Sequence, residues 1–241
     1  MQSLWPPGAT GNELTADELA AVYAYPDQLD RPYLRVNFVS SLDGSVAVQG
    51  LSGGLSSAPD RVVFGLLREL CEVVLVGAGT ARAEGYRGAR KPSRATGRPP
   101  RIAVVTSSAQ LDPHGPLLTD TSVPPLVLTT TAAPAENLDR LVAAGAEIDT
   151  RGTGPHELFA ALAERGLNRV LCEGGPSLFG QLIAADAVDE LCLTWAPLLA
   201  GGDAGRISRG SNQATRGMRL ASLLTEQDVL LAHYRRDRAV P

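Results

Sequence analysis

The hydrophobic positions of the chain alternate between short continuous runs and segments with helical spacing. Val73–Val76 and most of Arg169–Cys172 are continuous apolar runs, which are typical of strands buried on both faces. Just before the first run, apolar residues recur at the spacing of an amphipathic helix, at Val62, Val63, Leu66, Leu67 and Leu70. This alternation predicts an α/β protein in which helices cover both faces of a mixed sheet.

The same reading places the other elements. The predicted strands are Tyr33–Ser40, Val73–Val76, Arg101–Thr106, Pro125–Thr129, Arg169–Cys172, Asp189–Ala196, Arg219–Leu224 and Asp228–Arg235. The predicted helices are Pro59–Cys71, Glu136–Ala144, Pro155–Arg165 and Ser177–Ala184. Because no helix separates the last two strands, we expect the sheet to end in an antiparallel hairpin. Two polar segments, Arg82–Pro100 and Leu198–Thr215, are expected to be long loops, which are often functional or mobile.

The first 31 residues differ from this pattern. They carry one short predicted helix, which the capping box Thr15-Ala16-Asp17-Glu18 begins and Pro26 is expected to end. We therefore predict an N-terminal extension, residues 1–31, that packs onto a single domain formed by residues 32–238.

Composition and charge argue against several classes of function. The chain has 22 Lys and Arg against 26 Asp and Glu, and this net negative charge argues against a general nucleic-acid binder. Its apolar runs are shorter than the roughly 20 residues that span a bilayer, and its first residues lack the features of a secretory signal. The scattered cysteines suit a reducing compartment and suggest no metal site. We expect a cytoplasmic protein without membrane or nucleic-acid partners and without metal.

Two predicted strands end in glycine-rich turns that lead into helices. One turn is Gly77-Ala78-Gly79-Thr80, and the other is Glu173-Gly174-Gly175-Pro176-Ser177. Glycine lets a ligand approach the backbone closely, and the free N–H groups at a helix start favour phosphate. Either turn alone could be ordinary turn chemistry. Because both are expected at the carboxyl edge of one sheet, together they favour a phosphate-bearing cofactor.

Two carboxylates accompany these turns. Asp43, in Ser41-Leu42-Asp43-Gly44, could be simply a turn residue. Glu173 follows a buried strand and precedes a helix, so it is expected to be desolvated and oriented. Such a carboxylate suits acid–base chemistry or substrate binding.

Taken in order and spacing, these three motifs resemble the reductase domain of the bifunctional riboflavin-biosynthesis deaminase-reductases. Leu66-Leu67-Arg68 adds to the resemblance, which covers about Arg31 to Arg236. It implies a three-layer, dihydrofolate-reductase-like fold, with a mixed, mostly parallel sheet and an antiparallel C-terminal hairpin. Family members pair, so a homodimer is implied as well. The 31 residues before the first predicted strand are too few for the deaminase half, and its zinc motifs are absent. We therefore expect a stand-alone reductase.

The resemblance implies an NADPH-dependent enzyme that reduces 5-amino-6-(5-phosphoribosylamino)uracil to the ribityl form. The chain departs from the family at Ser45, where Lys or Arg is usual, and at Gly54, where Trp is common. These departures keep open a second interpretation, a dihydrofolate or other pterin reductase. A third is a non-catalytic nucleotide-binding protein, because a fold does not guarantee chemistry.

The resemblance also implies roles for individual residues. Cofactor binding is carried over to Val39, Gly54, Gly77, Gly79, Thr80, Glu84, Ser107, Gly174, Gly175, Pro176, Ser177 and Leu178. Substrate binding is carried over to Ser52, Arg68, Arg90 and Glu173, with Arg68 expected to hold the ribose phosphate. Asp43 and Glu173 are the implied catalytic carboxylates. The competing interpretation of Arg68 is a surface ion pair with Glu69 or Glu72.

Overall fold

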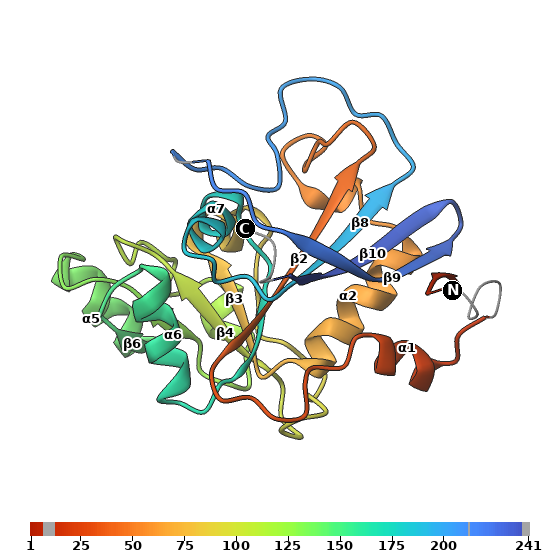
Figure 1. Cartoon of the computed structure of the whole chain (residues 1–241). Helices are drawn as coiled ribbons and strands as arrows, with labels where there is room; N and C mark the ends of the chain where they lie inside the picture. Colours follow the sequence, from red (N-terminus) through yellow and green to blue (C-terminus); the bar gives the residue numbers. More distant parts are fainter. Residues whose placement is uncertain (7–12, 212, 238–241) are drawn as a thin grey trace.

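A single sheet organises the molecule (Figure 1). The computed structural model describes residues 1–6, 13–211 and 213–237. Within these residues the strand order is β1-β9-β10-β8-β2-β7-β3-β4-β5-β6. The strands are β1 (Gln2–Trp5), β2 (Tyr33–Ser41), β3 (Val73–Gly77), β4 (Arg101–Val105), β5 (Leu126–Leu128), β6 (Glu147–Asp149), β7 (Arg169–Cys172), β8 (Glu190–Ala196), β9 (Met218–Glu226) and β10 (Val229–Arg236).

The sheet is parallel over most of its width and antiparallel at one side. From β8 through β2, β7, β3, β4 and β5 to β6, each strand pairs with its neighbour in parallel. β10 pairs antiparallel with β8 and with β9, and β1 closes that side antiparallel to β9. The predicted mixed sheet with an antiparallel C-terminal hairpin is confirmed.

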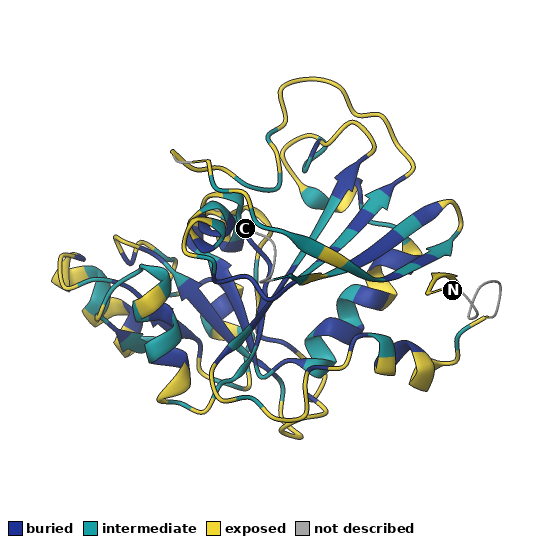
Figure 2. Ribbon diagram, viewed as in Figure 1, coloured by how far each residue is buried: buried dark blue, intermediate teal, exposed yellow. Residues whose placement is uncertain are grey.

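Helices cover both faces of the sheet, as predicted. They are α1 (Ala16–Val22), α2 (Ala58–Leu70), α3 (Ala78–Ala83), α4 (Pro116–Thr119), α5 (Ala135–Ala143), α6 (Pro155–Ala163) and α7 (Pro176–Ala184), with a 3₁₀ helix η1 (Ser52–Gly54). α1 and α2 pack on one face of the sheet, and α6 and α7 pack on the other. The central strands are buried between these layers, as Figure 2 shows. No helix among the described residues has the length and apolar character needed to cross a membrane.

Several elements depart from the sequence prediction. β1, β6, α3 and α4 were not expected, because each is too short to show a clear period. The capping box at Thr15 and Glu18 is present, but α1 ends at Val22, earlier than the expected stop at Pro26. Tyr23, which is 1% exposed, leaves the helix to enter the core. The extension packs on the sheet through β1 and α1, and the division at residue 31 stays a prediction.

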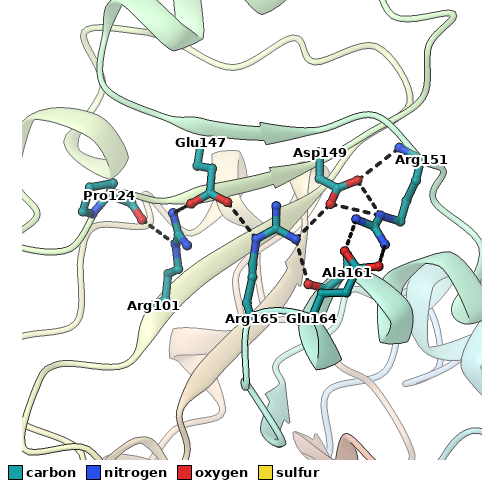
Figure 3. A network of polar contacts seen from close by, with 8 residues as sticks. All are labelled: Arg101, Pro124, Glu147, Asp149, Arg151, Ala161, Glu164 and Arg165. Atoms are coloured by element: carbon teal, nitrogen blue, oxygen red, sulfur yellow. Dashed lines mark hydrogen bonds and ion pairs between the residues drawn. The ribbon is translucent and has the colours of Figure 1, made fainter.

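The edge strand β6 is held by ion pairs, not by apolar packing alone (Figure 3). Glu147 accepts from Arg101 and from Arg165 Nε, the latter at 2.7 Å. Asp149 accepts from Arg165 Nη1 at 2.9 Å and from Arg151 Nε at 2.9 Å. The alternate charged residues explain why a strand forms here without an apolar run. Charged side chains on an edge strand also oppose pairing with another chain.

A second polar cluster lies inside the core and ties the extension to the sheet. Arg35 Nε donates to Glu190 Oε2 at 2.6 Å, and both side chains are fully buried. His233 Nε2 lies 3.2 Å from the same oxygen. The Arg35 guanidinium carbon also lies 4.0 Å from the centroid of the Tyr25 ring. Because Tyr25 belongs to the extension, this cluster anchors that segment through a cation–π contact.

Candidate active site

A cavity of about 690 Å³ opens beside α2, between the carboxyl ends of β2, β3 and β7. The described residues that line it include predicted site residues from all these elements: Val39, Ser52, Arg68, Gly79, Thr80, Glu84, Glu173, Gly175 and Pro176. The structure thus brings both glycine-rich turns and Glu173 to one hollow. In parallel α/β sheets this edge is the usual place for ligands.

The two glycine-rich turns touch each other. Gly77 N donates to Gly174 O at 2.8 Å. Gly174 has φ +87°, and a Cβ there would lie 2.8 Å from Phe38 Cζ. A Cβ on Gly175 would collide with Thr80 Oγ1. Glycine is therefore required at positions 174 and 175 by space, and at 174 also by conformation.

Both turns lead into helix starts that lack side-chain caps. Gly77 precedes α3 and Gly175 precedes α7, and neither helix start receives a side-chain hydrogen bond. Backbone N–H groups at the start of α7 therefore have no side-chain acceptor. An added Cβ on Gly79 would find no atom within 4 Å, so its surroundings are open. The free N–H groups and the dipole at the start of α7, together with the open space at Gly79, suit a phosphate-bearing cofactor.

Arg68 and Glu173 form a bidentate ion pair at the cavity wall. Arg68 Nε donates to Glu173 Oε1 at 2.7 Å, and Nη2 donates to Oε2 at 2.7 Å. Burial alone would lower the pKa of Arg68, but the charge of Glu173 raises it above its ordinary value. Glu69 instead pairs with Lys91 and Glu72 with Arg169, so neither is the partner of Arg68.

Tyr86 joins this pair and was not predicted as a site residue. Its hydroxyl donates to Glu173 Oε2 at 2.5 Å. Other lining residues that the sequence analysis did not assign include Asn37, Phe38, Ser56, Asp60, Arg61, Phe64 and Arg87. Arg61 and Phe64 precede Arg68 by seven and four residues, so helical spacing could have indicated them.

Asp43 lies elsewhere, in the turn after β2, and is not among the described residues that line the cavity. Its carboxylate accepts from Gly201 N at 2.7 Å, Ala200 N at 3.2 Å and the Ser41 hydroxyl. The Ser41 hydroxyl and then these N–H groups lower the pKa of Asp43 to about 2. Asp43 thereby ties its turn to the loop after β8. Its catalytic role stays a prediction.

Besides Asp43, seven predicted site residues are not among the described residues that line the cavity: Gly54, Gly77, Arg90, Ser107, Gly174, Ser177 and Leu178. Arg90 Nη2 donates to Asp120 Oδ2 at 2.7 Å, and its side chain is 68% exposed. Arg87, which lines the cavity, contacts the same oxygen at 3.2 Å. Gly54 borders a neighbouring cavity of about 820 Å³, and Ser107 is exposed after β4. Ser177 and Leu178 belong to the first turn of α7, with Leu178 buried in the core and Ser177 exposed.

Ser45, where the family usually has a cation, is buried. Its hydroxyl donates to Ala47 O at 2.9 Å. Ser45 is not among the described residues that line the 690 Å³ cavity, although Val46 and Ala47 are. The departure at Ser45 therefore changes the loop beside the cavity and not the described wall itself.

The sheet order and the cavity define an α/β protein with a cavity at the carboxyl ends of parallel strands, where such folds usually bind ligands. The chain belongs to the RibD C-terminal domain family, whose family model matches residues 32–231. This membership confirms the resemblance that the three motifs predicted.

Individual relatives agree with this membership. The riboflavin biosynthesis protein RibD of Bacillus amyloliquefaciens is 30% identical over 191 residues, which is 78% of this chain and 51% of that protein. The chain thus spans about half the length of that relative. The 2,5-diamino-6-ribosylamino-4(3H)-pyrimidinone 5′-phosphate reductase of Methanothermobacter thermautotrophicus is 31% identical over 179 residues, 71% of this chain and 81% of that enzyme.

A solved structure supports the fold. A pyrimidine reductase-like protein from Corynebacterium diphtheriae matches with a TM-score of 0.78 and 27% identity, covering 91% of this chain and 98% of that one. The expected fold is confirmed. Of the relatives, one is named a riboflavin biosynthesis protein and another a pyrimidinone 5′-phosphate reductase.

Proposed function

We propose that this chain is an NADPH-dependent reductase of a phosphoribosylamino-pyrimidine in riboflavin biosynthesis. The observation that carries the proposal is the cavity in which both glycine-rich turns meet the Arg68–Glu173 pair. A cofactor site and a polar substrate anchor thus share one hollow. The family membership and the reductase names of the relatives support the same reaction class.

The residues present fit the cofactor. Gly79, Thr80, Gly175 and Pro176 line the cavity, and added methyl groups would fill the space at Gly175. The uncapped start of α7 suits the pyrophosphate. The family resemblance carries further contacts with the same cofactor over to Val39, Gly54, Glu84, Ser107, Gly174, Ser177 and Leu178. When bound, NADPH supplies the hydride that reduces C1′ of the sugar, and the protein supplies position and charge.

Glu173 is proposed to anchor the substrate. As a carboxylate held by Arg68 and Tyr86, it is an acceptor-only group that faces the cavity. Amino and hydroxyl groups of a ribosylamino-pyrimidine are donors and complement it. Ser52, in η1, is also predicted to bind the substrate, and its backbone N–H donates to Glu84 Oε1 at 2.9 Å.

A substrate phosphate is bound best by cationic side chains that are not already neutralised by a carboxylate. The charge of Arg68 is balanced by Glu173, whereas Arg61 and Arg87 also line the cavity. Arg87 shares the single carboxylate of Asp120 with Arg90, so that cluster keeps a net positive charge. We propose that phosphate affinity depends on Arg61 and Arg87 more than on Arg68. Arg61→Ala is expected to raise KM for the phosphorylated substrate but to leave turnover of its dephosphorylated form unchanged.

Two pyrimidines are candidates, and they differ at ring position 2. The sequence predicts the uracil form, while the reductase from M. thermautotrophicus is named for the diamino-pyrimidinone. Because that relative is matched over 81% of its length, both substrates belong in the test.

Absorbance of the reduced nicotinamide tests the function directly. The protein is mixed with NADPH and, separately, with the uracil, the diamino-pyrimidinone and dihydrofolate. We expect NADPH oxidation with a pyrimidine, and a much lower but measurable kcat/KM in Glu173→Gln. Glu136→Gln, an exposed carboxylate in the first turn of α5, is the matched control and keeps full activity. Faster oxidation with dihydrofolate would assign the pterin alternative, and no oxidation with any of the three would refute the proposal.

A further inference from the structure

The backbone of Tyr86 is fixed by the way α3 ends. Gly85 has φ +61°, in the left-handed region. Tyr86 N donates to Ala81 O at 2.9 Å, and Gly85 N donates to Arg82 O at 3.3 Å. This pair of bonds is the Schellman motif, in which glycine is the favoured residue at the turning position. The helix end therefore sets where the tyrosine side chain enters the cavity wall.

The Tyr86 side chain meets Glu173 and Arg68 together. Its hydroxyl donates to Glu173 Oε2 at 2.5 Å, and its ring centroid lies 5.5 Å from the Arg68 guanidinium carbon. Phe64 contacts the same guanidinium, with its centroid at 4.6 Å. Three donor groups thus converge on one carboxylate: Arg68 Nε, Arg68 Nη2 and the Tyr86 hydroxyl.

We propose that Tyr86 is a positioning residue, whose hydroxyl holds Glu173 in the orientation that receives the substrate. The inference rests on the proposed function, because it concerns the same carboxylate. Oε2 accepts from both Arg68 and Tyr86, whereas Oε1 accepts from Arg68 alone. A carboxylate oxygen has room for more than one donor, so Oε1 is the oxygen with acceptor capacity left for the substrate.

The chemistry of the tyrosine supports this role. Burial, and then the charge of Glu173, raise the pKa of Tyr86 well above its ordinary value. The hydroxyl therefore keeps its proton at working pH and stays a donor. Because a donor–carboxylate arrangement rejects anions, the group recognised here is an N–H or O–H of the substrate, and the phosphate lies elsewhere.

Tyr86→Phe removes the hydroxyl and retains the ring against Arg68. We expect kcat/KM for the pyrimidine to fall about tenfold, with the loss mainly in kcat, and the NADPH dissociation constant to stay unchanged. The matched control is Tyr33→Phe. The Tyr33 hydroxyl donates to another buried carboxylate, Glu190, at 3.0 Å, and Tyr33 is not among the described cavity residues. The control is expected to change kcat/KM less than twofold.

A double-mutant cycle separates positioning from general stability. If Tyr86 acts through Glu173, then Tyr86→Phe added to Glu173→Gln lowers kcat/KM no further than Glu173→Gln alone. Thermal melting of each variant checks that it is folded. Additive losses in the cycle, or a Tyr86→Phe enzyme as active as Tyr33→Phe, would overturn the role of Tyr86 while leaving the proposed function intact. Absence of wild-type turnover would overturn both.

Discussion

Arg68 on α2 and Glu173 after β7 meet in a bidentate ion pair although 105 residues separate them in the chain. The Glu173 side chain is 3% exposed and that of Arg68 is 24% exposed, so the pair is largely removed from water. Bidentate arginine–carboxylate pairs fix geometry as well as charge. The pair therefore sets the shape and the electrostatics of the cavity wall before any ligand enters.

Removing one member of this pair tests its contribution to stability. Arg68→Ala leaves a buried carboxylate with Tyr86 as its remaining donor among the contacts described above, and we expect the free energy of unfolding to fall by about 2–4 kcal/mol. Urea denaturation measures this loss. Lys91→Ala is the control, because Lys91 is 75% exposed in its pair with Glu69 and exposed pairs contribute little, roughly 0–1 kcal/mol. An equal loss in the free energy of unfolding for Arg68→Ala and Lys91→Ala would show that the Arg68–Glu173 pair does not contribute more than an exposed pair.

The contact between Gly175 and Thr80 predicts a rescue experiment. Gly175→Ala places a methyl group against Thr80 Oγ1, so we expect NADPH affinity to fall at least tenfold. Thr80→Ala removes that oxygen, and the double variant is expected to recover part of the affinity. Gly65→Ala is the control, since no atom lies within 4 Å of its added Cβ. Fluorescence titration with NADPH compares these variants with the wild type, and unchanged binding in Gly175→Ala would place the cofactor elsewhere.

The buried Arg35–Glu190–His233 cluster predicts acid sensitivity. Burial lowers the pKa of His233 below its ordinary value of 6.5. Burial would raise the pKa of Glu190, but His233 and Arg35 lower it to about 2, from an ordinary value of 4.5. Both groups bind protons more weakly in the folded state, so each contributes stability that is lost as pH falls.

The free energy of unfolding should therefore decrease in two stages, first below pH 6.5 and then between pH 4.5 and about 2. His233→Gln is expected to remove the first stage. His156→Gln is the control, because the His156 side chain is 93% exposed. Denaturant unfolding across this pH range gives the comparison. If His233→Gln still loses stability below pH 6.5, that loss must come from another titratable group.

Asp43 offers a test between anchoring and catalysis. Its pKa of about 2 keeps Asp43 ionised at working pH, and its carboxylate oxygens accept hydrogen bonds from the N–H groups of Ala200 and Gly201. If Asp43 only anchors the loop, Asp43→Asn retains one acceptor oxygen and should retain most of kcat/KM. Asp43→Ala retains none, and its kcat/KM should fall about tenfold, which corresponds to about 1.4 kcal/mol. For a catalytic acid or base, both variants are equally inactive. Steady-state kinetics of the two variants decides.

The predicted homodimer and cytoplasmic location stay predictions. Light scattering of the purified chain measures the mass in solution. A monomeric mass across micromolar concentrations would contradict the dimer.

Local patterns in the sequence determined most of the elements. β7 coincides with the predicted strand Arg169–Cys172, and α2 and β3 begin and end within one residue of the predicted bounds. The physical reason is that periodic burial and turn residues act over a few positions. The two glycine-rich turns could also be placed at one sheet edge, because parallel strands share that edge.

Tertiary structure decided which side chains meet. The sequence offered Arg68 two near acidic partners, Glu69 and Glu72, yet it pairs with Glu173, which follows β7. Tyr86 reaches the same carboxylate only because α3 ends in a left-handed glycine and β3 and β7 lie side by side. β6 pairs with β5, and arginines from β4 and from the turn after α6 contact its acidic residues. Such contacts join distant segments, and their geometry exists only once the sheet is assembled.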